Sequence, residues 1–320
     1  MLNFFLVFII AFVIALVIGF PILKLCKKFH LSQTILHYVD NHSSKAGTPT
    51  MGGWMFLIAS LSAVFFLSGD ILQGCFILTI AFAYGFLGFL DDFIKVKYRK
   101  NEGLKPYQKI IGQVGIALII AIYVYLNIGG NLDLFGVSID LQWGIIPFTV
   151  IFFVAVTNAV NLTDGLDGLA GGVSFVYLIV FGVILAILGG FNNFAIISFA
   201  MAGAVLGFLL FNGFPAKIFM GDTGSLALGG VVASLASFSG LGLIMPIVGI
   251  MFVLSALSDV LQVGYFKLTH GKRIFKMAPL HHHFEKSGVH ENKIVISYIA
   301  ITLIAGLIVV MAYMAVKGVL

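Results

Sequence analysis

Two aspartates in the stretch Asn161–Ala170, read as NLTDGLDGLA, are the first residues that indicate chemistry. Asp164 and Asp167 are three residues apart, so any helical turn would place both on one face. They lie between two long apolar runs, and the chain has no Lys or Arg between Lys109 and Lys217. Because carboxylates at the edge of a bilayer are costly, they indicate a binding or catalytic site.

Two further acidic clusters adjoin apolar runs. Asp91 and Asp92 are adjacent in GFLDDFIK, and Lys95 follows one turn later as a partner for either acid. Neighbours on a helix point about 100° apart, so the two carboxylates need not share one ligand. Asp222 lies between glycines in FMGDTGS, where a carboxylate suits a hard cation such as Mg²⁺. Solvated charge at a helix end, or a helix cap at Asp222, is the simpler alternative.

Two segments with lysine or histidine are suited to phosphate. KAGTPTMGGW, residues 45–54, joins Lys45 to a proline-stiffened turn and two adjacent glycines. APLHHHFE, residues 278–285, has three consecutive histidines, whose side chains point in different directions and are therefore not expected to bind zinc. A plain loop is the alternative for each segment. Taken together, the clusters indicate Mg²⁺-assisted phosphoryl transfer, and no GxxxxGK[ST], GxSxG or HExxH motif is present.

The composition predicts an all-α polytopic membrane protein. Of 320 residues, 60% are hydrophobic and 10% are charged, against roughly 25% charged in soluble domains. The apolar runs are mostly about 18–24 residues long, which suits membrane-spanning helices and not the strands of a barrel. We expect one domain, residues 1–320, with ten transmembrane helices. The expected spans are residues 3–25, 51–69, 71–91, 109–127, 142–160, 169–189, 194–212, 225–239, 243–266 and 294–316.

The charge distribution predicts how the chain crosses the membrane. All of the 18 Lys and Arg except Lys317 fall in joints, or beside joints, on one side of the expected bundle. The positive-inside bias places that side in the cytoplasm and both termini outside. All acids except Asp70, Asp133 and Asp140 share the basic side, so we expect the chemistry there. The net charge of +5 thus reflects topology and does not indicate nucleic-acid binding. In the outer joint, residues 129–142, a short periplasmic hairpin is expected near Gly136.

Five segments in order resemble the phospho-N-acetylmuramoyl-pentapeptide transferases, a branch of the polyprenyl-phosphate hexose-1-phosphate transferases. The segments are GTPTMGG (47–53), GFLDDFIK (88–95), NLTDGLDGLAGG (161–172), FMGDTGSLALGG (219–230) and APLHHHFE (278–285). The resemblance implies transfer of phospho-MurNAc-pentapeptide from UDP-MurNAc-pentapeptide to undecaprenyl phosphate, with Mg²⁺ required and lipid I and UMP as products. It also implies a homodimer in the bacterial inner membrane, with its active site on the cytoplasmic face.

The same resemblance implies roles for single residues. Asp91 and Asp92 would act on the lipid phosphate, and Asp222 would bind Mg²⁺. The three histidines His281, His282 and His283 would close the site near the phosphates. The substrate-binding residues would be Lys45, Thr48, Lys95, Asn161, Asp164, Gly165, Leu166, Asp167, Asn212 and Phe219. Phe219 would stack on uracil, and Asp167 would accept a hydrogen bond from its ring.

Several alternatives stay open from the sequence. Within the same class, the donor could be UDP-N-acetylglucosamine, and the reaction could proceed in one step or through an aspartyl phosphate. In a different class, a cation-coupled transporter would use Asp164, Asp167 and Asp222 as its ion site. That reading predicts acids near mid-bilayer in broken helices, whereas these acids lie at borders between loops and spans. In an inert membrane scaffold the clusters would have no role.

Overall fold

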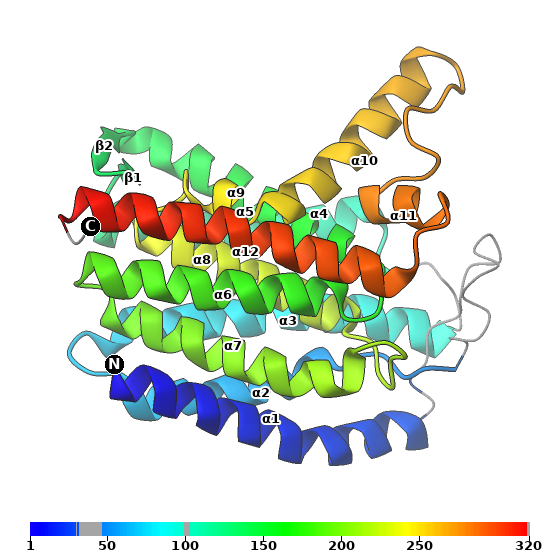
Figure 1. Cartoon of the computed structure of the whole chain (residues 1–320), viewed down its shortest axis with the longest axis horizontal. Coiled ribbons are helices and arrows are strands. Elements are labelled where there is room, and N and C mark those ends of the chain that lie inside the picture. Colours follow the sequence, from blue (N-terminus) through cyan, green and yellow to red (C-terminus); the bar gives the residue numbers. More distant parts are fainter. Residues whose placement is uncertain (30, 32–46, 99–102, 319–320) are drawn as a thin grey trace.

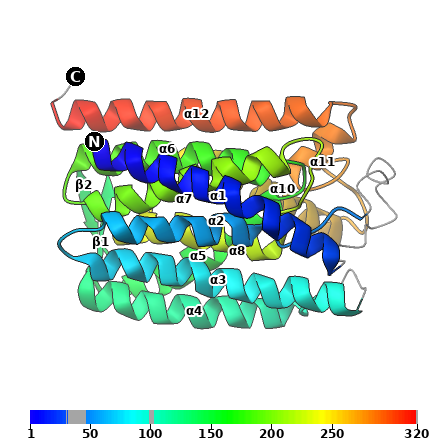
Figure 2. The ribbon, with the colours of Figure 1, turned by 90° about the horizontal axis from the view of Figure 1, so that it is seen from below.

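The protein is a bundle of long helices that run side by side along one axis (Figures 1 and 2). The computed structural model describes residues 1–29, 31, 47–98 and 103–318. Within them, eight helices are long and apolar enough to cross a membrane, which confirms the predicted class of all-α polytopic membrane protein. They are α1 (Leu2–Lys28), α3 (Ile71–Tyr98), α4 (Pro106–Asn127), α5 (Ile145–Thr163, preceded by the short helix η3, Gln142–Gly144), α6 (Leu169–Leu188), α7 (Asn192–Asn212), α10 (Ile250–Leu268) and α12 (Glu291–Val316).

The other expected spans take different forms. Helix α2 (Gly53–Ser60) continues as the 3-10 helix η2 (Leu61–Phe66). Together they form an apolar element that is shorter than the eight spanning helices. Helix α8 (Gly221–Phe238) is buried at every residue except Asp222, so it packs against protein on all sides and is rich in small residues. The expected span over residues 243–266 is not one continuous helix. Gly249 separates a short helix, α9 (Met245–Val248), from α10, and α10 leaves the direction of the bundle (Figure 1).

The hairpin expected in the outer joint is present. Strand β1 (Asn131–Leu134) pairs antiparallel with β2 (Val137–Asp140). Leu134 pairs with Val137, which leaves Phe135 and Gly136 as a two-residue turn with φ of 52° and 86°, as a type I′ hairpin requires. Both chain termini lie at this end of the bundle (Figure 1).

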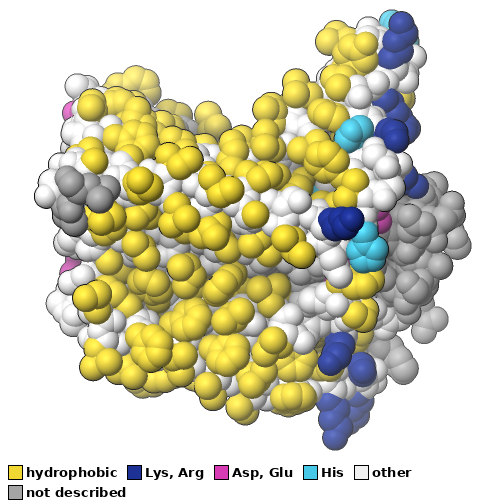
Figure 3. Space-filling model, viewed as in Figure 1, with side chains coloured by type: hydrophobic (Ala, Val, Ile, Leu, Met, Phe, Trp, Pro, Cys, Tyr) yellow, Lys and Arg dark blue, Asp and Glu magenta, His cyan; other side chains and the backbone are white. Residues whose placement is uncertain are grey.

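The surface divides as the charge pattern predicts. Hydrophobic side chains cover the flank of the bundle, and Lys and Arg gather at the end opposite the hairpin (Figure 3). Basic residues occupy the last turns of α1, α3 and α10. The short helix α11 (Leu280–Glu285), which carries the three histidines, lies at this end too (Figure 1).

Glycines bring α2, α3 and α8 close enough to build a site at the basic end. A Cβ on Gly88 of α3 would lie 2.1 Å from the carbonyl oxygen of Asp222, and a Cβ on Gly53 would lie 2.3 Å from the Cα of Gly224. Only glycine permits such approaches between backbones. The end of α3 and the start of α8 are therefore in direct contact, which places Asp91 and Asp92 beside the first turn of α8.

Candidate active site

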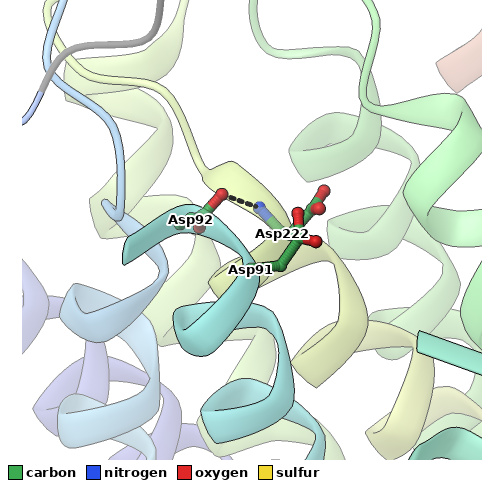
Figure 4. A group of neighbouring side chains, drawn as sticks. All are labelled: Asp91, Asp92 and Asp222. Atoms are coloured by element: carbon green, nitrogen blue, oxygen red, sulfur yellow. Dashed lines mark hydrogen bonds between the residues drawn. The ribbon is translucent and has the colours of Figure 1, made fainter. Parts of the chain in front are cut away.

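Three carboxylates meet where α3 ends and α8 begins. Asp91, Asp92 and Asp222 each offer one oxygen, and these oxygens all lie within 4.8 Å of one another (Figure 4). The side chains of Asp91 and Asp92 are almost wholly buried. A set of oxygen donors without sulfur or nitrogen suits Mg²⁺. The residues therefore fit the expected cation, and Asp91 and Asp92 join Asp222 as candidate ligands, although the sequence singled out Asp222 alone for this role.

Asp92 also holds the start of α8. Its Oδ1 accepts a hydrogen bond from the amide of Asp222 at 3.1 Å, marked in Figure 4. Its Oδ2 accepts from the amide of Thr223 at 2.9 Å and from the Thr223 hydroxyl at 2.7 Å. The first amides of a helix have no partner within that helix, so Asp92 caps α8 from a different element. Through this contact it sets the position of Asp222.

Two lysines neutralise part of the cluster. Lys95 lies 2.6 Å from Oδ2 of Asp91, which confirms it as a partner of that acid, and 2.9 Å from Oδ2 of Asp222. Lys109 lies 3.0 Å from the same Asp222 oxygen. The sequence analysis counted Lys109 only among the basic residues on one side of the expected bundle and missed this role. Pro106 at the start of α4 was the available signal, because it puts Lys109 in the first turn, at the same end as Asp91.

Residues of the stretch NLTDGLDGLA contact two different parts of the protein. Asn161, at the end of α5, donates to Oδ1 of Asp222 at 2.7 Å and accepts from Lys109 at 3.3 Å. It therefore lies in the carboxylate cluster, whereas the resemblance gave it only as one of ten substrate-binding residues. Asp167 lies on the other side, where its Oδ2 accepts from the amide of Ala216 at 2.9 Å. The next amide, Gly168, donates to Oδ1 of Asn212 at 3.1 Å, so Asp167 and Asn212 do come together.

Asp164 follows the last residue of α5 and stands between these two parts of the protein. Burial, and then the negative charges of Asp222, Asp92 and Asp167, raise the pKa of its carboxyl to about 8. The group therefore holds a proton at neutral pH in the metal-free protein.

This protonation predicts a pH-dependent stability. Between the ordinary pKa of 3.8 and the raised value of about 8, the folded chain binds a proton at Asp164 that the unfolded chain has lost. The unfolding free energy should therefore fall as pH rises through that window. In Asp164→Asn the slope should be clearly smaller. Thermal unfolding of the metal-free protein in detergent, at steps from about pH 5 to about pH 8, measures both slopes. Equal slopes in the two proteins would contradict the assignment.

The three histidines of α11 point in different directions, as expected. His281 is fully buried against Gly165, where a Cβ would lie 2.2 Å from its Nε2. Neither ring nitrogen has a hydrogen-bond partner among the described residues, and burial, then the neighbouring His282, hold the pKa of His281 well below its usual value. His282 pairs with Glu285 at 3.0 Å, and Nδ1 of His283 accepts from the amide of Lys276. His281 is therefore the histidine that packs against Gly165 in the loop after α5.

Thr48 and Phe219 lie near the start of α2. The amide of Phe219 donates to the carbonyl of Pro49 at 2.7 Å, and the carbonyl of Phe219 accepts from Gly52 at 2.9 Å. Thr48 precedes this contact and is half-buried, as is Phe219. Leu166 is buried. Lys45 lies outside the described residues.

Comparison with known proteins matches the amino-acid sequence to a family of transferases. Residues 74–240, which include all three clustered aspartates, match the family described as glycosyl transferase family 4. The chain is 45% identical over 305 residues to the phospho-N-acetylmuramoyl-pentapeptide-transferase of Clostridium novyi (strain NT), covering 93% of each chain. Its counterpart in Clostridium perfringens (strain 13 / Type A) is 45% identical over 291 residues, covering 90% of this chain and 91% of the relative.

The protein of the same name from Caldanaerobacter subterraneus subsp. tengcongensis is 46% identical over 268 residues, covering 82% of this chain and 84% of the relative. These matches cover between 82% and 93% of this chain. The chain therefore belongs to the phospho-N-acetylmuramoyl-pentapeptide transferases, within glycosyl transferase family 4.

Proposed function

We propose that this protein transfers phospho-MurNAc-pentapeptide from UDP-MurNAc-pentapeptide to undecaprenyl phosphate, forming lipid I and UMP in a Mg²⁺-dependent step of peptidoglycan synthesis. The observation that carries the proposal is the cluster of Asp91, Asp92 and Asp222. It lies at the basic end of a membrane bundle whose sequence is 45% identical to these transferases. A diphosphate donor needs that combination of carboxylates for the cation and lysines for phosphate.

The cluster can supply what phosphoryl transfer requires. Asp91, Asp92 and Asp222 would hold Mg²⁺, whose charge would stabilise the UMP leaving group. Lys95 and Lys109 stand beside Asp222, where their ammonium groups can neutralise phosphate oxygens. A phosphate whose second pKa is near 6 has little proton left to remove at pH 7, so a carboxylate serves mainly to orient it. Because Asp92 holds the start of α8, we assign that role to Asp91.

The competing readings differ in what they require of the same residues. A cation-coupled transporter would need Asp164, Asp167 and Asp222 in broken helices near the bilayer centre. Asp164 and Asp167 instead lie in the loop between α5 and α6, and Asp222 lies in the first turn of α8. A transferase that uses UDP-N-acetylglucosamine would keep the cluster. The names of the relatives and the segment with three histidines favour the MurNAc-pentapeptide donor.

The finer topology also belongs to the proposal. We assign ten membrane passes, with α2 and η2 as one, α8 as one and α9 with α10 as one. Both termini then lie outside and the carboxylate cluster lies on the cytoplasmic face of the inner membrane. The gathering of Lys and Arg at the cluster end (Figure 3) supports this orientation. The homodimer is proposed from the family resemblance.

A UMP-release assay with purified protein tests the function. Release should require UDP-MurNAc-pentapeptide, undecaprenyl phosphate and Mg²⁺ together, because the lipid phosphate is the acceptor. A transporter or scaffold would release no UMP under any condition. Exclusive turnover of UDP-N-acetylglucosamine would replace the proposed donor with that of the related branch.

Asp167→Ala tests the nucleoside side of the site. We expect the KM for UDP-MurNAc-pentapeptide to rise about tenfold, equivalent to about 1.4 kcal/mol, with little change in the KM for undecaprenyl phosphate. The reason is that Asp167 ties the loop after α5 to Ala216, close to the expected uracil site. Steady-state kinetics for both substrates measure the two values. Asp140→Ala at the hairpin is the control, and an unchanged donor KM in Asp167→Ala would remove the uracil role.

A further inference from the structure

Glu291, the first residue of α12, reaches across to the loop after α5. Its Oε1 accepts a hydrogen bond from the amide of Asp167 at 2.6 Å, although the two residues are 124 positions apart. The sequence reading counted Glu291 only among the acids on the basic side. The structure places it against the residue that we assign to the nucleoside.

The loop depends on partners outside itself. The consecutive amides of Asp167 and Gly168 donate to Glu291 and to Asn212, which come from α12 and α7. Asp167 is 4% exposed, and a buried amide that loses its acceptor is costly. The carboxylate of Asp167 is directed by its own backbone. Glu291 therefore holds the peptide that aims the Asp167 side chain.

A second contact joins the start of α12 to the segment that follows α7. The ring of His290 packs edge-on against the ring of Phe214, with centroids 5.6 Å apart. Phe214 lies in the segment that leads from α7 to Ala216, and the amide of Ala216 donates to Asp167. One turn of α12 thus contacts the loop after α5 and the segment after α7.

A simpler explanation for Glu291 is the helix dipole. An acid in the first turn of a helix is favourable without any outside contact. Here, however, the cap of α12 is His290, whose Nδ1 accepts from the amide of Asn292 at 3.2 Å. Oε1 of Glu291 accepts from the amide of a different element. His290 therefore caps α12, and Glu291 is left to bind the backbone amide of Asp167. The contact of Glu291 thus does more than stabilise α12.

We propose that Glu291 is a positioning residue for donor binding: it holds the Asp167 backbone so that the loop after α5 presents a fixed surface to the nucleoside. The proposal rests on the nucleoside role assigned to that loop above. It makes the start of α12 part of the donor site, which lies apart from the carboxylate cluster of Asp91, Asp92 and Asp222.

Three substitutions separate the hydrogen bond from the dipole. Glu291→Gln keeps the acceptor oxygen and the length of the side chain but removes the charge. Glu291→Asp keeps the charge but is shorter by one methylene. If Glu291 positions Asp167, the Gln variant should stay within about twofold of the parent in donor KM, and the Asp and Ala variants should rise about tenfold. The KM for undecaprenyl phosphate should not change in any of them.

The dipole explanation predicts the opposite order, with Glu291→Asp close to the parent and Glu291→Gln impaired. That order, or a loss of kcat with both KM values unchanged, would overturn the proposal. The Gln and Asp pair decides the question even if Glu291→Ala fails to fold. Asp167→Ala, measured beside them, distinguishes the two failures. If it leaves the donor KM unchanged, the nucleoside role of the loop is wrong. If it raises the donor KM while Glu291→Ala and Glu291→Asp do not, only the Glu291 proposal is wrong.

Discussion

Asp222→Asn should leave a folded protein that has lost Mg²⁺-dependent UMP release, with kcat reduced by about a thousandfold or more. The Asp222 carboxylate is the point on which Lys95, Lys109 and Asn161 converge. Asparagine keeps the shape and can accept hydrogen bonds. It removes the negative charge that a divalent cation needs and leaves the two lysines with less compensation.

A Mg²⁺ titration of UMP release, together with thermal unfolding, measures this prediction. The fold should persist because the substitution conserves volume and because the backbone of residue 222 still donates to Asp92. Asp70→Asn, which removes a carboxylate from the opposite end of the protein, is the matched control and should behave as the parent does. Near-normal turnover of Asp222→Asn would remove this residue from the metal role.

Gly88→Ala should reduce activity by at least about a hundredfold and lower the unfolding free energy by about 2–3 kcal/mol. The added Cβ would lie 2.1 Å from the Asp222 carbonyl oxygen and 2.6 Å from the Thr223 amide nitrogen. These are backbone atoms of the first turn of α8, so they cannot rotate away as a flexible side chain would. Helices α3 and α8 must therefore separate, and Asp91 and Asp92 must move away from Asp222.

Gly115→Ala on α4 is the matched control for this substitution. No heavy atom lies within 4 Å of a Cβ built there among the described residues, and alanine is favoured over glycine inside a helix by up to about 1 kcal/mol. Gly115→Ala should therefore be neutral or slightly stabilising. Chemical denaturation and UMP release report the two effects. If the two variants behave alike, close contact between α3 and α8 is not what positions the carboxylates.

Much of the fold follows from the sequence because it depends on local properties. Apolar length predicts the helices, and their observed bounds lie close to the expected ones for α1, α6 and α7. Glycine and the alternation of strands predict the hairpin at Phe135 and Gly136. The break at Gly249 was missed because a lone glycine inside an apolar run is a weak signal. The end at which Lys and Arg gather was predictable because consecutive connections between membrane spans lie at opposite ends of the bundle.

The residues of the candidate site were likewise predictable only in part from the sequence. The sequence by itself determined the candidates for the chemistry: the aspartates of three segments, Lys95, and the histidines of α11. Only the tertiary structure decided which of them meet. Asp92 contacts α8 across 130 positions, Lys109 reaches Asp222 across 113, and Glu291 reaches Asp167 across 124. Hydropathy and spacing specify where a helix begins and which face is polar, but the choice of neighbouring helix depends on close packing of small residues such as Gly88, which no local pattern encodes.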